Sequence, residues 1–178
     1  MNKEFNPNTI SLIIGLGNPG EEYTNTFHNA GRLIVEKILE VQSLSSPKHS
    51  FSYTKMEQKI FMTSNLYMNE SGIAVSDALA YFKLSHSSLF VIHDDADLQI
   101  GTTKLQYGRS DAGHNGIKSI IRTLGTEEFW RFRVGIRNEK DDEEKRRKAK
   151  TFVLSQIKRS EKKIFQLEAE TIKKMLVM

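Results

Sequence analysis

Residues 12–31 read Leu-Ile-Ile-Gly-Leu-Gly-Asn-Pro-Gly-Glu-Glu-Tyr-Thr-Asn-Thr-Phe-His-Asn-Ala-Gly, and the fold is organised around this stretch. Its first residues, together with Ile10, form a short, β-branched apolar run closed by glycine, which predicts a buried strand. A loop rich in Gly, Asn and Pro follows, carries His28 near its end, and gives way to a helical pattern at about Ala30. Open α/β sheets bind ligands at the carboxyl ends of their strands, so we expect the chemistry in this loop.

Residues 15–20 also fit Gly-x-Gly-x-x-Gly, the spacing of dinucleotide-binding proteins. That fingerprint needs a helix opening at the third glycine, with free N–H groups facing a pyrophosphate. Glu21 and Glu22 stand there and would repel a diphosphate, and the acids about 20 residues on fall inside a predicted helix. We therefore interpret the glycines as a tight turn that needs positive φ, which leaves Asn18 and His28 unexplained.

The composition is that of a globular domain. The 178 residues are 38% hydrophobic and 27% charged, which suits one domain with a full core. No apolar run approaches the roughly 18 residues of a membrane span and no signal-peptide pattern opens the chain, so we expect a cytoplasmic protein without a membrane partner. The absence of cysteine excludes disulfides, thiol nucleophiles and cysteine-ligated zinc.

Charge is unevenly distributed along the chain. Residues 1–100 carry 7 Lys and Arg against 11 Asp and Glu, a balance of −4, whereas residues 101–178 carry 19 against 11, a balance of +8. A basic second part indicates a polyanionic partner, with nucleic acid the first candidate. A solvated basic surface that only maintains solubility explains the same numbers.

Strand and helix patterns alternate along the chain. Strands are predicted at 51–55, 59–63, 89–92, 102–107 and 132–137, and helices at 30–41, 72–83, 117–124 and from about 160. Ser71 is the expected cap of the second helix. The prediction is an α/β fold: a single domain over 1–178 with a twisted mixed, mostly parallel sheet flanked by helices on both faces. Its C-terminal part, about 138–178, is expected to form a helical or lid segment.

Residues 141–150 form a run of charges in which each acid has a base four residues later. This spacing favours a solvated helix. A phosphate-binding arm is the functional alternative for the same run.

Polar residues gather in four predicted loops. These residues are Asn18 and His28, Met68 and Asn69, His93 and Asp94, and His114 and Asn115. An imidazole can take a proton from water at neutral pH, and a carboxylate on its other nitrogen fixes the tautomer. Carboxamides donate to a developing oxyanion and accept from an amide N–H. This combination fits hydrolysis without a metal, and the absence of Gly-x-Ser-x-Gly disfavours a serine acyl-enzyme.

Motifs at these positions match one known family across nearly the whole chain. They are residues 15–20 with Tyr23, 26–31, 67–69 with 71–72, 93–94 with 97–98, 113–116 with 119–120, 131–136 and 152–154. Their order and content resemble the bacterial-type peptidyl-tRNA hydrolases. The resemblance implies a monomeric enzyme without cofactor or metal. It would cleave the ester between a peptide and the 3′ ribose of tRNA, and so recycle the tRNA.

The resemblance also implies a role for each matching residue. By analogy, His28 is the general base on water and Asp94 supports it, while Asn18 and Asn69 position the ester and the blocked amino acid. The other implied substrate contacts are Met68 and Asn115 on the peptide side, Tyr23 and Tyr67 on the tRNA-borne substrate, Lys104 and Arg133 on the tRNA 5′ phosphate, and His114 near the site.

Several positions depart from the family pattern. Residues 96–101 lack the usual proline, and Gln106 replaces a second lysine of the phosphate clamp. Arg109 and Asp111 place charges where the family has mostly glycine, and the C-terminal tail is short. These departures bear on tRNA affinity more than on the reaction.

Two other functions remain open at this stage. A metal hydrolase could draw its ligands from His28, His93, Asp94, Asp95, Asp97 and His114, although no recognised ligand spacing supports it. A non-catalytic RNA-binding member of the same fold would need neither His28 nor Asp94, and both are present.

Overall fold

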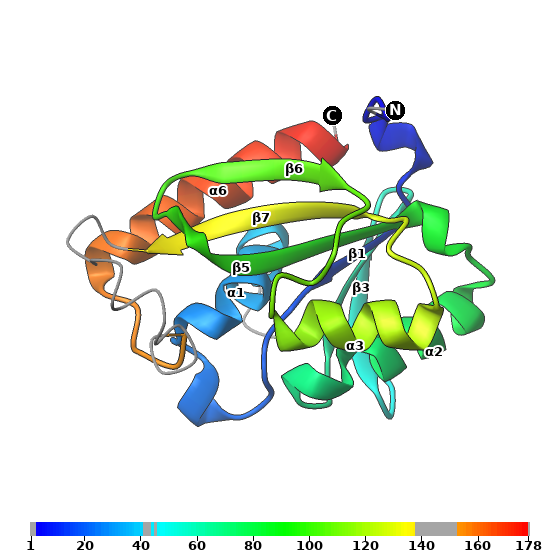
Figure 1. The fold of residues 1–178 in the computed structure, drawn as a ribbon, viewed down its shortest axis with the longest axis horizontal. Coiled ribbons are helices and arrows are strands. Elements are labelled where there is room, and N and C mark those ends of the chain that lie inside the picture. The colour runs from blue at the N-terminus through cyan, green and yellow to red at the C-terminus, as the bar shows by residue number, and fades with distance from the viewer. Residues whose placement is uncertain (1–2, 41–43, 45, 138–152, 178) are drawn as a thin grey trace.

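A computed structural model describes residues 3–40, 44, 46–137 and 153–177. Within these residues, a seven-stranded sheet has the order β2–β3–β4–β1–β5–β7–β6 (Figure 1). The strands are β1 (Leu12–Gly15), β2 (Ser46–Pro47), β3 (Phe51–Met56), β4 (Lys59–Ser64), β5 (Leu89–Gln99), β6 (Thr103–Tyr107) and β7 (Trp130–Arg137).

The four central strands, β4, β1, β5 and β7, run parallel, and the outer strands add antiparallel pairs at both edges. The predicted mixed, mostly parallel sheet is confirmed. Because β1 and β5 are parallel neighbours, with Gly15 beside Ile92, the segments that follow β1 emerge next to the second half of β5. The predicted polar residues meet here, at the carboxyl end of the central strand β1 and beside the second half of β5.

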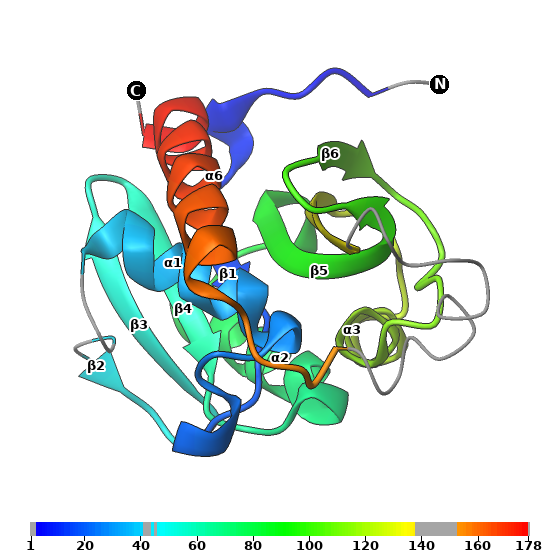
Figure 2. The ribbon, with the colours of Figure 1, turned by 90° about the vertical axis from the view of Figure 1, so that its left-hand side faces the viewer.

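Helices cover both faces of the sheet, as predicted (Figures 1 and 2). They are α1 (Ala30–Leu39), α2 (Ser71–Phe82), α3 (Asn115–Leu124) and α6 (Arg159–Val177), with short 3₁₀ turns η1 (Pro7–Thr9), η2 (Glu21–Tyr23), η3 (Phe27–Asn29), η4 (Met68–Glu70) and η5 (His86–Ser88). One core contains α1 and α6 and the other contains α2 and α3. Side chains alternate across a strand, so Ile13 enters the first core while Leu12 and Ile14 enter the second.

Helix α1 lies directly against the backbone of β1 and β5. A Cβ atom on Gly31 would collide with the carbonyl of Ile92, and one on Gly15 would collide with the carbonyl of Gly31. Of the three glycines in the Gly-x-Gly-x-x-Gly motif, only Gly20 has positive φ, at 106°. The turn interpretation is therefore wrong for Gly15 and Gly17, which serve close packing instead.

Strand β5 is longer than the apolar pattern indicated. The strand expected at 89–92 continues to Gln99, so His93 and Asp94 lie in a strand rather than in a loop. They pair with β7, a partner distant in sequence, and local polarity concealed that pairing. The predicted N-cap is also wrong: Ser71 is the first residue of α2, and its hydroxyl donates to the carbonyl of Met68 at 2.8 Å.

The C-terminal helix is confirmed. Helix α6 runs beside α1 (Figure 2) and buries Phe165, Ala169, Ile172 and Leu176 in the first core. The charge run at 141–150 lies outside the described residues. No helix among the described residues has the length and apolar character needed to cross a membrane.

Glu168 is a buried carboxyl on the core side of α6. It is 7% exposed, and neither carboxylate oxygen has a hydrogen-bond partner among the described residues. Burial disfavours the charged form and raises the pKa of Glu168 to about 8. An unfolded glutamate has a pKa of about 4.3, so between these values the native state binds the extra proton. The free energy of unfolding therefore falls as pH rises through this window, by up to about 1.4 kcal/mol per pH unit.

We expect Glu168→Gln to remove this pH dependence, because glutamine cannot ionise. Melting of the two proteins should be similar at pH 5, whereas the variant should melt roughly 4–10 °C above wild type at pH 8. The control is Glu170→Gln, which changes an exposed glutamate of the same helix. Melting curves that shift equally for both variants at pH 8 would contradict the assignment.

Candidate active site

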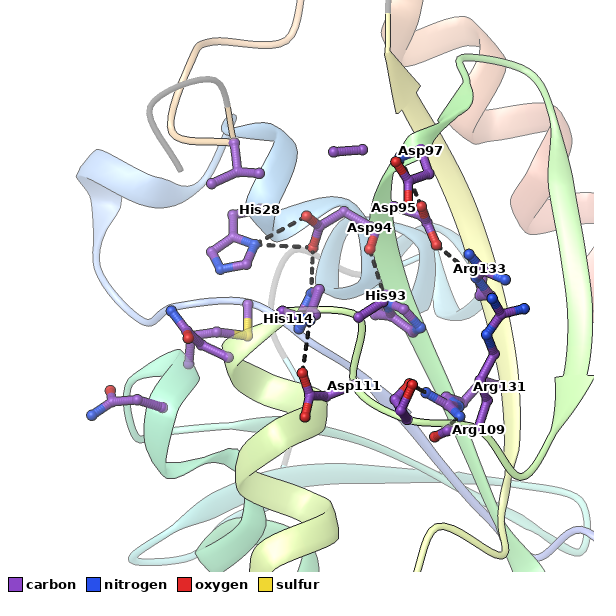
Figure 3. A pocket seen from close by; sticks show the side chains of 18 of the residues that line it. His28, His93, Asp94, Asp95, Asp97, Arg109, Asp111, His114, Arg131 and Arg133 are labelled. Carbon is purple, nitrogen blue, oxygen red and sulfur yellow. Dashed lines mark hydrogen bonds and ion pairs between the residues drawn. The ribbon is translucent and has the colours of Figure 1, made fainter. Parts of the chain in front are cut away.

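A cavity of about 550 Å³ opens beyond the carboxyl end of β1, beside the polar second half of β5 (Figure 3). Its wall comes from β5, the loop between β6 and α3, the start of α3, and the segments around Asn18, Met68 and Val153. The four groups of polar residues expected to meet therefore line one pocket: Asn18 and His28, Met68 and Asn69, His93 and Asp94, His114 and Asn115.

His28 is fixed by both its backbone and its ring. It lies in η3 just before α1, and its backbone N–H donates to the carbonyl of Val153 at 2.7 Å. Its ring nitrogen Nδ1 lies 3.0 Å and 3.1 Å from Oδ1 and Oδ2 of Asp94. A carboxylate only accepts, so Nδ1 carries the proton and Nε2 keeps its lone pair. The predicted His–Asp pair is therefore present with Nε2 available as a base.

His114 holds the same carboxylate from the opposite side. It is the N-cap residue of α3, and its Nδ1 accepts from the backbone N–H groups of Gly116 at 3.1 Å and Ile117 at 3.3 Å. Because Nδ1 accepts, the proton is on Nε2, which donates to Oδ1 of Asp94 at 2.9 Å. The start of α3 thus selects one tautomer of His114 and directs its N–H at Asp94 (Figure 3).

Burial and charge oppose each other at this pair. Asp94 is 2% exposed; burial alone would raise its pKa, but the His28 and His114 imidazoles and their hydrogen bonds hold the pKa of Asp94 well below its ordinary value. For His28, burial lowers the pKa, and the charge and hydrogen bond of Asp94 outweigh it, so the pKa is raised above 6.5. An ionised Asp94 therefore strengthens His28 as a proton acceptor.

His93 adds a third imidazole behind the pair. Its Nδ1 donates to the backbone carbonyl of Asp94 at 2.8 Å, and its Nε2 has no partner among the described residues. Burial, followed by the neighbouring His114, holds the pKa of His93 well below 6.5, so the ring is neutral. We interpret His93 as a support of the strand backbone at Asp94.

Asn18 is oriented by a residue that the sequence analysis did not single out. Asn29 accepts from the backbone N–H of Asn18 at 2.8 Å and donates to its carbonyl at 2.9 Å. The side-chain Oδ1 of Asn18 accepts from the backbone N–H of Met68 at 2.7 Å. With Oδ1 occupied, the donor group Nδ2 is the part of Asn18 that can serve a ligand. Asn29 directly follows His28 in the chain, but only the fold reveals this contact.

The remaining expected contacts are distributed around the rim. Tyr67, Asn69 and Asn115 line the pocket; Tyr23 does not, but its ring packs edge-on against Tyr67 at a centroid distance of 6.3 Å. The lid expected at about 138–178 is only partly within the described residues: Val153 and Leu154 line the pocket, whereas α6 belongs to the core.

The two implied phosphate-clamp residues lie opposite each other in the β6–β7 pairing, but their environments differ. Lys104 is exposed and outside the pocket lining. Arg133 lines the pocket, and its guanidinium is already bound: Nε donates to Oδ2 of Asp95 at 2.6 Å and an Nη donates to Oε1 of Gln106 at 2.8 Å. Gln106 and Asp95 thus compete with any phosphate for Arg133.

The described residues contain one group that could be considered for a metal, His28, Asp94 and His114, with ligand atoms within 4.8 Å of one another. The hydrogen bonds do not suit a cation there. Nδ1 of His114 accepts two backbone N–H groups, so binding a metal through Nε2 would require an anionic imidazolate. Asp95, another potential metal ligand, forms an ion pair with Arg133. The donor set therefore favours a hydrogen-bonded triad over a metal centre.

The chain matches one known protein family over most of its length. The family model for peptidyl-tRNA hydrolase matches residues 12–178. The peptidyl-tRNA hydrolase of Lactobacillus delbrueckii subsp. bulgaricus is 42% identical over 135 residues, which cover 72% of this chain and 73% of the relative. That of Caldicellulosiruptor saccharolyticus is 40% identical over 162 residues, covering 87% and 82%.

A solved structure resembles the whole fold as well. The crystal structure of peptidyl-tRNA hydrolase from Acinetobacter baumannii superposes with a TM-score of 0.79 at 27% identity, covering 95% of this chain and 89% of that one. Sequence and structure agree along nearly the full length, and the chain belongs to the peptidyl-tRNA hydrolase family.

Proposed function

We propose that this protein hydrolyses the ester between the peptide, or an N-blocked aminoacyl group, and the 3′ ribose of tRNA. Family membership supports the activity. The observation that carries the mechanism is the carboxylate of Asp94 on Nδ1 of His28, at 3.0 Å and 3.1 Å, which leaves Nε2 unprotonated toward the pocket. The chain would recycle tRNA as a cytoplasmic monomer.

The chemistry needs one water and no covalent intermediate. His28 Nε2 takes a proton from water as the oxygen attacks the ester carbonyl, and Asp94 stabilises the resulting imidazolium. Nδ2 of Asn18 would donate to the oxyanion, because Oδ1 already accepts from the backbone N–H of Met68. The ester C–O bond then breaks, and the proton returns from His28 to the 3′ oxygen. The products are a peptide carboxylate and a tRNA with a free 3′ hydroxyl.

The carboxamides of Asn69 and Asn115 line the same pocket and would bind the first amino acid of the peptide. A carboxamide oxygen accepts a hydrogen bond from the N–H of an acylated amino group. A free α-ammonium carries a charge that is costly to desolvate and presents the wrong donor pattern. These residues therefore support selectivity for a blocked amino group.

One test of the mechanism concerns His28. His28→Ala should lower the rate of deacylated tRNA release from N-acetyl-aminoacyl-tRNA by about 10²–10⁴-fold, because the base on water is lost. The matched control is His49→Ala, since His49 is exposed and does not line the pocket. Turnover is measured with and without a chelator, and the wild-type rate should be the same in both.

Two results would oppose this account. Loss of wild-type turnover on addition of chelator would favour a metal hydrolase. Wild-type protein that binds tRNA in a salt-dependent way but releases none would favour a non-catalytic RNA-binding member of the fold.

A separate test concerns the amino group of the substrate. Wild-type protein should hydrolyse N-acetyl-aminoacyl-tRNA at least 10²-fold faster, by kcat/KM, than the same aminoacyl-tRNA with a free amino group. Asn69→Ala and Asn115→Ala should reduce this ratio of kcat/KM values, mainly by lowering kcat/KM for the N-acetylated substrate. Equal rates on the two substrates in wild type would refute selection by these carboxamides.

A further inference from the structure

The loop between β6 and α3, residues 108–114, forms one wall of the pocket, and hydrogen bonds from β7 fix its backbone. Arg131 of β7 is 3% exposed, and its guanidinium donates to the backbone carbonyls of Arg109 and Ser110, the latter at 3.1 Å. The backbone of the loop has positive φ at Gly108 and Ala112. The hydrogen bonds from Arg131 to the carbonyls of Arg109 and Ser110 therefore fix the backbone at Arg109, and the side chain of Arg109 takes no part in them.

The other charged groups on this side of the pocket have partners within the protein. Arg133 is bound to Asp95 and Gln106, and Oδ1 of Asp111 accepts from the backbone N–H of Gly113 at 2.7 Å. The carboxylate of Asp94 is held by His28 and His114. These interactions reduce the number of hydrogen-bond donors or acceptors that each of these side chains has left for a ligand.

Arg109 differs from these groups. It lines the pocket and is exposed, and its guanidinium has no ion pair or hydrogen bond among the described residues. Figure 3 shows His28 and Arg109 on opposite sides of the pocket. A ligand that places an ester at His28 can therefore extend toward a guanidinium whose donors are available.

We propose that Arg109 binds a phosphate group of the tRNA acceptor end while the ester lies at His28. This inference rests on the proposed function, which supplies a polyanionic substrate. A guanidinium presents paired N–H donors that match phosphate oxygens, and such charge-assisted hydrogen bonds are stronger than neutral ones. Arg109 thereby supplies the contact that Arg133 cannot make freely beside Asp95 and Gln106.

Two phosphates share this chemistry: a phosphodiester of the 3′-terminal nucleotides and the 5′-terminal phosphate. We would measure kcat and KM for wild type, Arg109→Ala and Arg109→Lys on three N-acetyl-aminoacyl substrates. These are full tRNA, the same tRNA without its 5′ phosphate, and a short 3′ oligonucleotide. Arg122→Ala is the control, because Arg122 is exposed on α3 and does not line the pocket.

On full tRNA, Arg109→Ala should raise KM about tenfold with kcat nearly unchanged. The negative slope of log(kcat/KM) against log[salt] should become less steep by about one. Arg109→Lys should fall between the two, since it keeps the charge and loses the paired donors. An effect that persists on the short oligonucleotide assigns the 3′ phosphodiester; one that disappears without the 5′ phosphate assigns that group. Equal KM values for wild type and Arg109→Ala on all three substrates would overturn the proposal.

Failure of the proposed function gives a different result. If wild type turns over no substrate, the binding of deacylated tRNA is measured instead by fluorescence anisotropy. Weaker binding by Arg109→Ala than by Arg122→Ala would then support the phosphate contact without catalysis. Binding equal to wild type would reject it.

Discussion

The site depends on the hydrogen bonds that the buried carboxylate of Asp94 accepts from His28 and His114. A carboxylate that is 2% exposed needs donors to compensate for its loss of water, and it receives one N–H from each of two imidazoles. His28 comes from the segment entering α1, on one face of the sheet, and His114 caps α3, on the other face. Asp94 of β5 thus connects the helices on the two faces of the sheet. It does so beside the end of β1, where the pocket opens.

Backbone packing makes this meeting possible. Gly31 lets the first turn of α1 lie against the carbonyl of Ile92, two residues before Asp94, and Gly15 accommodates the same helix from β1. Any larger side chain at Gly31 would push α1 away and withdraw His28 from its carboxylate. Gly15 and Gly17 of the nucleotide-like fingerprint therefore allow α1 and the residues just before it to pack closely against the chain at the end of β1. Positive φ explains only Gly20.

Much of the fold was accessible from the sequence because local patterns determine it. Short apolar runs identified the core strands, and helical spacing identified α1 and α6. The polar half of β5 was missed because its pairing with β7 depends on residues about 40 positions away, which no local pattern encodes. Most residues that line the pocket near His28 were predicted by their type and by family resemblance. Their orientation was not: the brace from Asn29 to Asn18, the tautomer of His114 and the capture of Arg133 by Asp95 are contacts between distant segments.

Asp94 fixes His28 as a base whose Nε2 is unprotonated. The most direct measurement is an ¹⁵N NMR titration of the histidine rings in wild type and Asp94→Asn. We expect neutral His28 to carry its proton on Nδ1 and to titrate above pH 6.5, because the effect of the carboxylate on the pKa exceeds that of burial. In Asp94→Asn the charge is lost while burial remains, so the pKa should fall below the wild-type value. A wild-type His28 protonated on Nε2, or a pKa that Asp94→Asn leaves unchanged, would contradict the account.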